Sequence, residues 1–368
     1  MVSLQSHWIV TMQIFQPTPH TSSHRVNSQF HTQTPISSQS GGYSKSLTSF
    51  PPPLRCPVFC EPLVYLFNKS LATSVVPRQW KQTSIRPVPK TATPLNHSDY
   101  RPISIALVLS RTLERIVVRE FLYPAILDPP MPLSYGDQFA FRPTGSTTAA
   151  LIALMQTITD LLTTNSFVCL TALDFSKAFD TVRHDTLLSK MVLLNILDVI
   201  YNRLADFFQD HEHCTKIWNI NISDMVHVSA NIIQGSAIGP VSYDINASDV
   251  STVTPGNLMY KYADDTYLVI PTSNAQSRKT EVNHVAEWAR KNNLKLNRVK
   301  SVEIISKDRK RKQQIPDPPT LPDIKRESQI KILGVTITKH LSVSEHVRDV
   351  IGKCGQSMYV LNVLRSDG

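Results

Sequence analysis

The sequence predicts an α+β fold, because helical and strand-like patterns alternate irregularly along the chain and the points richest in carboxylates lie at strand ends. Helical spacing of apolar residues is present from Leu109 to Leu127, from Ser146 to Leu162 and from His184 to Phe208. Short apolar, β-branched runs at 167–175 and 257–270 are instead typical of strands. Both patterns recur along the chain, and no internal repeat is visible.

The elements are expected to follow an N-terminal segment that is disordered. Residues 1–57 are rich in Ser, Thr, Gln, Pro and His and have no sustained hydrophobic period. Order should begin near Val58, with a helix whose apolar stripe runs from Leu63 to Leu71. Several prolines and short β-prone runs between residues 85 and 109 predict strands joined by loops.

The second half of the chain continues the mixed pattern. Residues 225–233 alternate like a strand and are followed by a glycine-containing break. A helix is expected from 277 to 292, and an exposed, charged and proline-rich loop is expected over 306–326. A strand pair should then bend around Gly334.

Lysine and arginine outnumber acidic residues, and the surplus is concentrated in one stretch. The chain has 38 Lys and Arg against 29 Asp and Glu, which gives a net charge of +9. Residues 277–312 contain 12 of the basic and four of the acidic residues, so this stretch alone carries +8. Such a surplus favours a polyanionic partner, either nucleic acid or an acidic membrane surface, although a solvated basic face would have the same composition.

Cysteine usage and hydropathy predict an intracellular protein. The five cysteines are odd in number and scattered, and no CxxC pair occurs, which is typical of a reduced compartment. No apolar run approaches the ~20 residues of a membrane span, and the first residues lack the pattern of a secretory signal. We therefore expect no membrane partner, and the composition does not distinguish nucleus from cytoplasm.

Carboxylates at the ends of two predicted strands indicate phosphoryl-transfer chemistry. Asp174 ends the run 167–175, while Asp264 and Asp265 form the tight turn of the hairpin 257–270. Adjacent carboxylates raise each other's pKa unless a cation lies between them, and Mg²⁺ prefers such oxygen ligands. Catalysis with two metal ions about 3.5–4 Å apart requires carboxylates from more than one backbone segment. The alternative for Asp264 and Asp265 is an ordinary polar turn, in which Asp is common.

Ten short motifs in a fixed order resemble the polymerase region of non-LTR (LINE-type) retrotransposons, from about Val58 to about Val350. A lone YADD is a weak pattern, but ten motifs in order form a specific signal. The motifs are NKSL (68–71) with Pro77 and WK (80–81), IRPVPK (85–90), DYRPIS (99–104), LERI (113–116), QFAFRP (138–143), LDFSKAFD (173–180), QGS (234–236), YADDT (262–266), LKLN (294–297) before Lys300, and ILGV (332–335).

The resemblance implies a right-hand polymerase with fingers and palm, in which an antiparallel palm sheet packs on helices. It divides the chain into a disordered polar segment (1–57), a fingers-like region (58–165), a palm with the carboxylates (166–305), and a last part (306–368) with a basic loop, a primer-grip-like turn and the truncated start of a thumb. It implies a reverse transcriptase, which adds dNTPs to a DNA primer 3′-end on an RNA template with two Mg²⁺ ions, or with Mn²⁺ as an alternative.

The resemblance also assigns roles in the catalytic centre. Asp174, Asp264 and Asp265 match the polymerase carboxylates, with Asp174 and Asp264 as direct metal ligands and Asp265 more peripheral. The backbone carbonyl of Phe175 would complete the metal shell. Lys300 matches a lysine that acts as general acid toward pyrophosphate, although a simple phosphate contact is the alternative in so basic a stretch.

Five further positions match contacts to the incoming nucleotide. The cations of Lys90, Arg101 and Arg142 would bind its triphosphate. Gln234 and Gly235 would form the loop that packs on the nucleotide, where glycine permits close backbone approach.

Three other features match sugar selection and primer binding. Phe179 matches the ring that blocks a ribose 2′-hydroxyl, with core packing as the alternative role. Leu333 and Gly334 match the primer-grip turn. The basic stretch 278–312 would contact template and primer with salt-dependent affinity.

The chain also departs from the family pattern. Ile233 stands where proline usually precedes the QGS motif. The residues at 237–240 and 247–249 also differ from those usual in the family. Thr144-Gly145 replaces a usual Gly-Arg. Residues 1–57 are too short and polar for a nuclease domain, and no Cys-His knuckle is present. The rival interpretation is therefore a catalytically inactive, nucleic-acid-binding remnant. Group II intron maturases and telomerase-like enzymes share the carboxylates, but motifs 99–104 and 174–180 favour the retrotransposon group.

Overall fold

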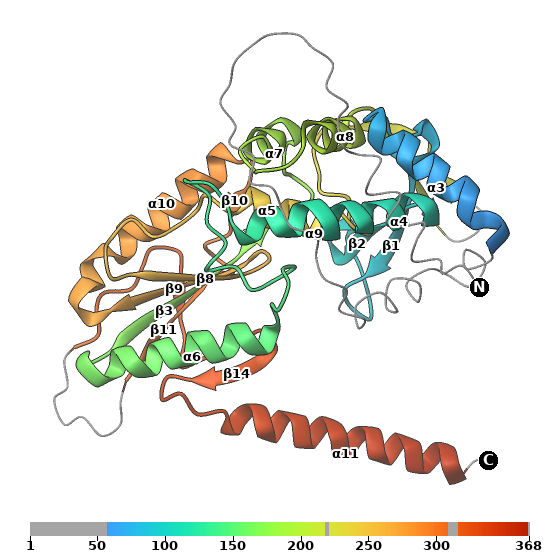
Figure 1. Ribbon diagram of the computed structural model, residues 1–368. Helices are drawn as coiled ribbons and strands as arrows, with labels where there is room; N and C mark the ends of the chain where they lie inside the picture. Colours follow the sequence, from blue (N-terminus) through green and yellow to red (C-terminus); the bar gives the residue numbers. More distant parts are fainter. Residues whose placement is uncertain (1–56, 218–220, 308–315, 367–368) are drawn as a thin grey trace.

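A five-stranded sheet carries the predicted carboxylates in the computed structural model, which describes residues 57–217, 221–307 and 316–366 (Figure 1). We call it the palm sheet. Its strands lie in the order β12-β11-β3-β9-β8, and neighbours are antiparallel except for the parallel pair of β11 and β12. The bounds are β3 Val168–Leu173, β8 Leu258–Tyr262, β9 Asp265–Pro271, β11 Val302–Ser306 and β12 Lys325–Arg326.

Helices cover both faces of the palm sheet, as Figure 1 shows. Side chains alternate between the two faces of a strand, so neighbouring residues join different cores. Leu170 shares a hydrophobic core with α6 (Thr147–Thr164), whereas Leu268 packs in the core that contains α10 (Arg278–Lys291). The sheet is therefore held between α6 and α10, and only its strand ends remain free to carry polar chemistry.

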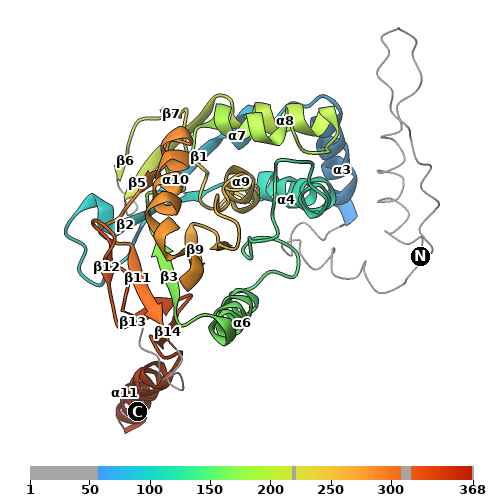
Figure 2. The ribbon, with the colours of Figure 1, turned by 90° about the vertical axis from the view of Figure 1, so that its left-hand side faces the viewer.

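A second sheet (Figure 2) combines strands from two distant parts of the chain. Its order is β2-β1-β5-β6, and β7 also pairs with β5. The pair of β1 and β5 is parallel, so residues 82–85 lie beside residues 212–215. The bounds are β1 Gln82–Pro89, β2 Tyr100–Ile105, β5 His211–Ile217, β6 Asn221–Ile222 and β7 Val226–Val228. A division of the chain at residue 165 does not separate the two sheets, because β5 and β7 extend the sheet of β1 while α6 packs on the palm sheet.

Most of the remaining helices share one hydrophobic core with α10. Their bounds are α3 Pro57–Ala72, α4 Val108–Val117, a π-helical segment Val118–Leu122, α5 Tyr123–Leu127, α7 His184–Met191, α8 Asp198–Phe208 and α9 Gly239–Asn246. Short 3₁₀ helices are Arg78–Lys81, His97–Asp99 and Thr272–Ser277. Two-stranded sheets are formed by β4 (Phe175–Ser176) with β10 (Lys295–Leu296) and by β13 (Gln329–Ile332) with β14 (Val335–Thr338).

The last helix, α11 (Ser344–Ser366), extends away from the other elements in both views (Figures 1 and 2). It has no buried residue. Within the described ranges, no helix combines the length and the apolar character that crossing a membrane requires.

The predicted α+β class is confirmed, and so are the helices that became α3, α6 and α10. The helix expected over 184–208 is broken at 192–197 into α7 and α8, and the strand expected over 225–233 is reduced to β7. Strands β5 and β11 and helix α9 have no predicted counterpart, since each is too short or too polar to show a clear period. The disorder predicted for residues 1–57 lies outside the described residues, apart from Pro57, with which α3 begins.

Candidate active site

Asp174, Asp264 and Asp265 lie near one another because the ends of β3 and β9 meet. Leu173, the last residue of β3, pairs with Thr266 of β9, so Asp174 follows in register beside Asp265. Asp264 belongs to the two-residue turn that joins β8 to β9. Carboxylates from two backbone segments therefore gather at one end of the palm sheet.

The turn that carries Asp264 is held by the buried side chain of Gln138, which is 2% exposed. Ala263, the first residue of the turn, has a φ of 55°, a left-handed conformation that is uncommon outside glycine. The amide of Ala263 donates to Gln138 Oε1 (3.0 Å), and the amide of Ala140 donates to the same oxygen (3.0 Å). Gln138 is a motif position, but the sequence held no sign of a contact with a residue 125 positions away.

A loop before β11 fixes the backbone of Asp174. The amide of Asn297 donates to the carbonyl of Asp174 (2.8 Å), and the amide of Asp174 donates to Ser301 Oγ (3.1 Å). The next residue, Phe175, begins β4 and pairs with Leu296 of β10. Asn297 stands in the LKLN motif, which indicated Lys300 but gave no reason to single out Asn297 or Ser301.

Burial raises the pKa of all three carboxyl groups. For Asp174 partial burial is the main cause, and the nearby charge of Lys300 opposes it. For Asp264 the charge of Asp174 adds to burial. Burial, and then the charges of Asp264 and Asp174, raise the pKa of Asp265 to about 6. A bound cation would stabilise the ionised form of these carboxyl groups, which burial and their mutual repulsion disfavour.

The donor set therefore fits a divalent metal ion by its chemistry. Oxygen ligands from two or more carboxylates are what Mg²⁺ takes in proteins. In the part of the chain that the structure describes, no three His, Cys, Asp or Glu side chains stand close enough together to hold an ion as they are. The fit consequently rests on the charges and ligand types of the three aspartates.

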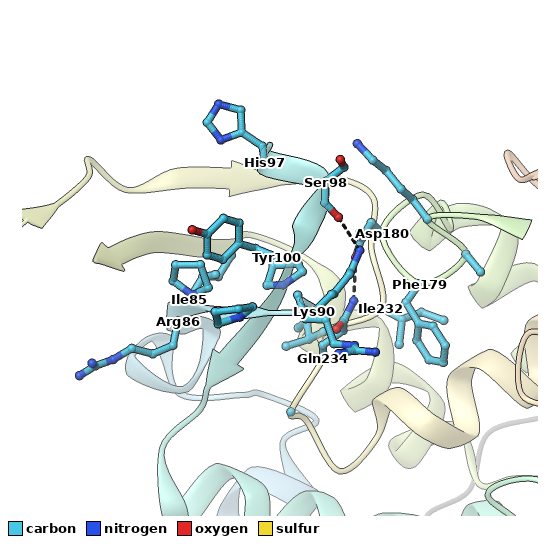
Figure 3. A pocket seen from close by; sticks show the side chains of 18 of the residues that line it. Ile85, Arg86, Lys90, His97, Ser98, Tyr100, Phe179, Asp180, Ile232 and Gln234 are labelled. Atoms are coloured by element: carbon cyan, nitrogen blue, oxygen red, sulfur yellow. Dashed lines mark hydrogen bonds between the residues drawn. The ribbon is translucent and has the colours of Figure 1, made fainter. Parts of the chain in front are cut away.

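A cavity of about 1700 Å³ opens next to the carboxylates and brings together most of the predicted site residues (Figure 3). Those in its wall are Lys90, Arg101, Asp174, Phe175, Phe179, Gln234, Gly235, Asp264 and Lys300. Asp174 and Lys300 also line a second cavity of about 430 Å³, together with Asp265 and residues of β13. Asp174 thus stands between the two cavities.

The ring of Phe179 both lines the large cavity and packs against other rings. It stacks on Tyr243 with ring centroids 4.6 Å apart, and its edge meets Phe141 at 6.5 Å. Stacked and edge-to-face contacts of this kind favour one ring orientation. Phe179 packs on the neighbouring rings and also faces the cavity, so its position is compatible with both core packing and sugar selection.

The loop at Gln234 and Gly235 is held by backbone and side-chain contacts. Gln234 Nε2 donates to Asp180 Oδ1 (2.9 Å), as the dashed line in Figure 3 marks. Gly235 has a φ of 114°, and a Cβ there would lie 2.2 Å from the carbonyl oxygen of Ser104. The close approach that requires glycine is therefore to the backbone of β2, whereas the sequence suggested a close approach to the nucleotide.

The three basic side chains expected to bind the triphosphate differ in their position relative to the large cavity. Lys90 and Arg101 are exposed and line the large cavity, although the ammonium of Lys90 donates to the carbonyl of Ser98 (2.8 Å). Arg142 does not line it. Its guanidinium instead donates to the backbone carbonyls of Tyr135 and Gln138.

Leu333 and Gly334 form the turn between β13 and β14, with φ values of 46° and 91°. Positive φ at both central residues is the geometry of a tight hairpin turn. The backbone of Leu333 is hydrogen-bonded to the hydroxyl of Tyr267, which lies on β9 two residues after Asp265. The predicted primer-grip turn is therefore linked directly to the strand that begins with Asp265.

The basic stretch divides into buried and exposed side chains. Arg278 is buried and paired with Glu303 in the palm sheet, so it does not contribute to a basic surface. Lys279, Lys291, Lys295 and Lys300 are exposed. Residues 308–312, which hold four of the predicted cations, lie outside the described residues.

A fourth carboxyl group, Asp244 of α9, is buried and follows Tyr243 in the chain. It is 1% exposed, and among the residues that the structure describes neither of its oxygens has a hydrogen-bond partner. Burial raises its pKa to about 8, and the charges of Lys261 and Arg142 oppose this only in part. A carboxyl group whose pKa is higher in the folded state stabilises the fold while protonated. That contribution is complete below about pH 4 and is lost as the pH rises toward 8.

Asp244→Asn is therefore expected to become increasingly more stable than the unmodified chain as the pH rises from 5 to 8. The difference in unfolding free energy should grow by up to about 1.4 kcal/mol per pH unit. Urea unfolding at pH 5, 6.5 and 8 measures it, and Asp224→Asn at an exposed position is the matched control. Parallel pH profiles for Asp244→Asn and the unmodified chain would contradict the assignment of a buried, protonated carboxyl group.

Comparisons with known proteins find a family model and curated relatives that match this chain. The family model described as "Reverse transcriptase (RNA-dependent DNA polymerase)" matches residues 88–337. The "RNA-directed DNA polymerase from mobile element jockey" of Drosophila melanogaster is 26% identical over 301 residues, which are 78% of this chain and 32% of that protein. The "Probable RNA-directed DNA polymerase from transposon BS" of the same organism is 26% identical over 82% of this chain and 34% of that protein. The chain spans about a third of the length of these curated relatives.

Solved structures show the same fold at low identity. Telomerase from Candida tropicalis, in complex with a TWJ fragment of telomeric RNA, has a TM-score of 0.50 and 13% identity, covering 78% of this chain and 48% of that chain. Apo telomerase from the same organism has a TM-score of 0.50 and 12% identity, covering 78% and 53%. With its motifs, its carboxylate-bearing sheet and a family match over residues 88–337, the chain belongs to the reverse transcriptase (RNA-dependent DNA polymerase) family, and the resemblance to non-LTR elements is confirmed.

Proposed function

We propose that this chain is an RNA-directed DNA polymerase that adds dNTPs to a primer 3′-end on an RNA template. The observation that carries the proposal is the strand register that sets Asp174 beside the Asp264–Asp265 turn at the wall of a large cavity. Lys90 and Arg101 in the same wall supply the positive charge that a triphosphate requires.

Two Mg²⁺ ions, or Mn²⁺ as an alternative, are proposed to bind Asp174, Asp264 and the carbonyl of Phe175, with Asp265 more peripheral. When bound, such ions activate a 3′-hydroxyl and stabilise the leaving pyrophosphate. Asn297 and Ser301 hold the backbone of Asp174, and Gln138 holds the turn of Asp264, so the backbone segments that carry these ligands are fixed. Lys300 is proposed to give a proton to pyrophosphate or, alternatively, to contact a phosphate.

The same proposal assigns the wider surface. The sheet of β1 and β2 would act as fingers, the sheet of β3, β8 and β9 as palm, and the turn of Leu333 and Gly334 as primer grip. Exposed lysines on and after α10 would contact template and primer, with an affinity that falls as salt rises.

The decisive experiment is extension of a labelled DNA primer on an RNA template by the full chain with Mg²⁺ and dNTPs. Extension supports the polymerase. Salt-dependent binding of the primer–template without any extension would instead support the rival interpretation, an inactive nucleic-acid-binding remnant.

Phe179→Val is expected to admit ribonucleotides, because the ring at the cavity wall would no longer fill the space beside the sugar. The preference for dNTP over rNTP should fall by roughly 10- to 200-fold, the range for a lost apolar contact in a specificity pocket. Single-nucleotide incorporation kinetics with dNTP and rNTP measure this preference. Phe179→Tyr keeps the ring and should remain selective. Unchanged selectivity in Phe179→Val would leave core packing on Tyr243 as the role of Phe179.

A further inference from the structure

We propose that Glu114 is a positioning residue that fixes the nucleotide-binding loop, residues 234–237, in the shape needed for dNTP binding. The inference rests on the proposed polymerase function and concerns the affinity for the incoming nucleotide. Glu114 lies on α4 and is 1% exposed, so it touches neither solvent nor substrate. Any effect on the reaction must therefore pass through the groups that it contacts.

Glu114 binds the loop through one carboxylate oxygen that accepts two hydrogen bonds. Ser236 Oγ and the amide of Ala237 both donate to Oε2, each at 2.7 Å. The hydroxyl of Ser236 in turn accepts from the amide of Ile238 (3.0 Å), so its own proton is committed to Glu114. Hydrogen bonds to a buried charged acceptor are short and strong, and leaving such donors unpaired is unfavourable.

Besides the contact with Glu114, the loop is held by two other contacts. The amide of Ser104 donates to the carbonyl of Gln234 (2.7 Å), and the side chain of Gln234 is held by Asp180. Both contacts lie before Gly235, which has no Cβ and a φ of 114°, a conformation that other residues rarely adopt. After this glycine the amide of Ser236 donates to the carbonyl of Ile233 (3.1 Å) within the loop, and Glu114 ties the loop to α4. Glu114 therefore fixes the direction in which Gln234 and Gly235 face the cavity.

The other side of Glu114 is occupied by groups that do not reach the loop. Ser110 Oγ donates to Oε1 (2.7 Å) from one helical turn earlier. Arg203 of α8 is buried, and Glu114 favours its charged form against a burial that lowers its pKa to about 10. Glu114 is thus hydrogen-bonded within α4 and to the loop, and its charge acts on Arg203 of α8. Because Arg203 would lose a charge partner, a Glu114 variant is expected to be less stable as well.

The test compares Glu114→Gln, Ser236→Ala and the matched control Ser110→Ala in steady-state incorporation of one dNTP on an RNA template. We expect Glu114→Gln to raise the KM for dNTP about tenfold with kcat changed less than threefold, since roughly 1.4 kcal/mol of loop anchoring would be lost. Ser236→Ala should raise KM about threefold, and Ser110→Ala should leave it unchanged. The affinity for the primer–template should be the same in all three. The double variant Glu114→Gln/Ser236→Ala should show less than the product of the two single effects, because both remove the same contact.

A folded Glu114→Gln with an unaltered KM for dNTP would overturn the proposal, as would equal changes in Glu114→Gln and Ser110→Ala. If Glu114→Gln does not fold, Ser236→Ala decides alone, because it removes the contact from the loop side and leaves Glu114 beside Arg203. Failure of the inference is distinct from failure of the proposed function, since the latter would appear as no extension by the unmodified chain.

Discussion

Asp264→Asn is expected to lower primer extension by on the order of a thousandfold, a loss of about 4 kcal/mol of transition-state stabilisation. The substitution keeps the size and shape of the side chain but removes the charge that would hold a divalent ion at the end of the palm sheet. The turn itself should persist, because Gln138 binds the amide of Ala263 and not the side chain of Asp264. Single-turnover extension with Mg²⁺ measures the effect.

Two controls separate loss of chemistry from loss of fold in Asp264→Asn. Its urea midpoint should be no lower than that of the unmodified chain, because burial and Asp174 already disfavour the ionised form of Asp264. Asp160→Asn, at an exposed position on α6, should leave extension unchanged. Full activity of Asp264→Asn would disprove the role of this carboxylate in binding metal.

Glu303→Ala is expected to lower the free energy of unfolding by about 3–5 kcal/mol, the usual result of removing one partner from a buried ion pair. Glu303 is 1% exposed and is the second residue of β11. Its Oε1 lies 2.5 Å from Arg278 Nη1, and its Oε2 accepts from Arg326 Nε at 2.9 Å. The substitution would leave the two guanidinium groups without their anion. Urea unfolding monitored by tryptophan fluorescence measures the change.

Glu327→Ala is the matched control for Glu303→Ala. Glu327 follows β12 and pairs with the exposed Lys325 of that strand, which lies beside β11. Surface pairs of that kind are worth about 0–1 kcal/mol, so its midpoint should hardly move. The double variant Arg278→Met/Glu303→Leu should recover much of the lost stability, because apolar residues remove the need to compensate a buried charge. Equal midpoints for Glu303→Ala and Glu327→Ala would contradict the assigned network.

The sequence was informative about those parts of the site that depend only on residues close together in the chain. A short apolar strand followed by Asp174, and a hairpin that turns at Asp264, are visible within ten residues of each position. The structure adds the strand register, in which Leu173 and Thr266 are the last paired residues before the carboxylates. The three aspartates therefore lie together at one end of the palm sheet, and their catalytic roles stay predictions.

Contacts between distant segments were not predictable in the same way. Nothing near Gln138, Glu114 or Arg142 reveals which backbone atoms they meet, because those partners lie elsewhere in the chain or in loops without periodicity. Arg142 shows the consequence, as its guanidinium binds two carbonyl groups of its own loop and lies outside the cavity wall. The net charge of residues 277–312 was a poor guide to the basic surface for a related reason. Counting charged residues placed Arg278 in the basic stretch, but a count cannot distinguish a buried ion pair from an exposed cation.

The segment of residues 137–139 that holds the Asp264 turn has a second effect, on solubility. The amide of Lys261 donates to the carbonyl of Asp137 (2.7 Å), and the amide of Phe139 donates to the carbonyl of Lys261 (2.8 Å). Both bonds are made at Lys261, on the outer side of β8, which is the last strand of the palm sheet, so they pair this edge at that position. An uncovered edge strand of this apolar kind is a template for pairing with another molecule. The contacts that position the turn therefore also protect the sheet against edge-to-edge aggregation.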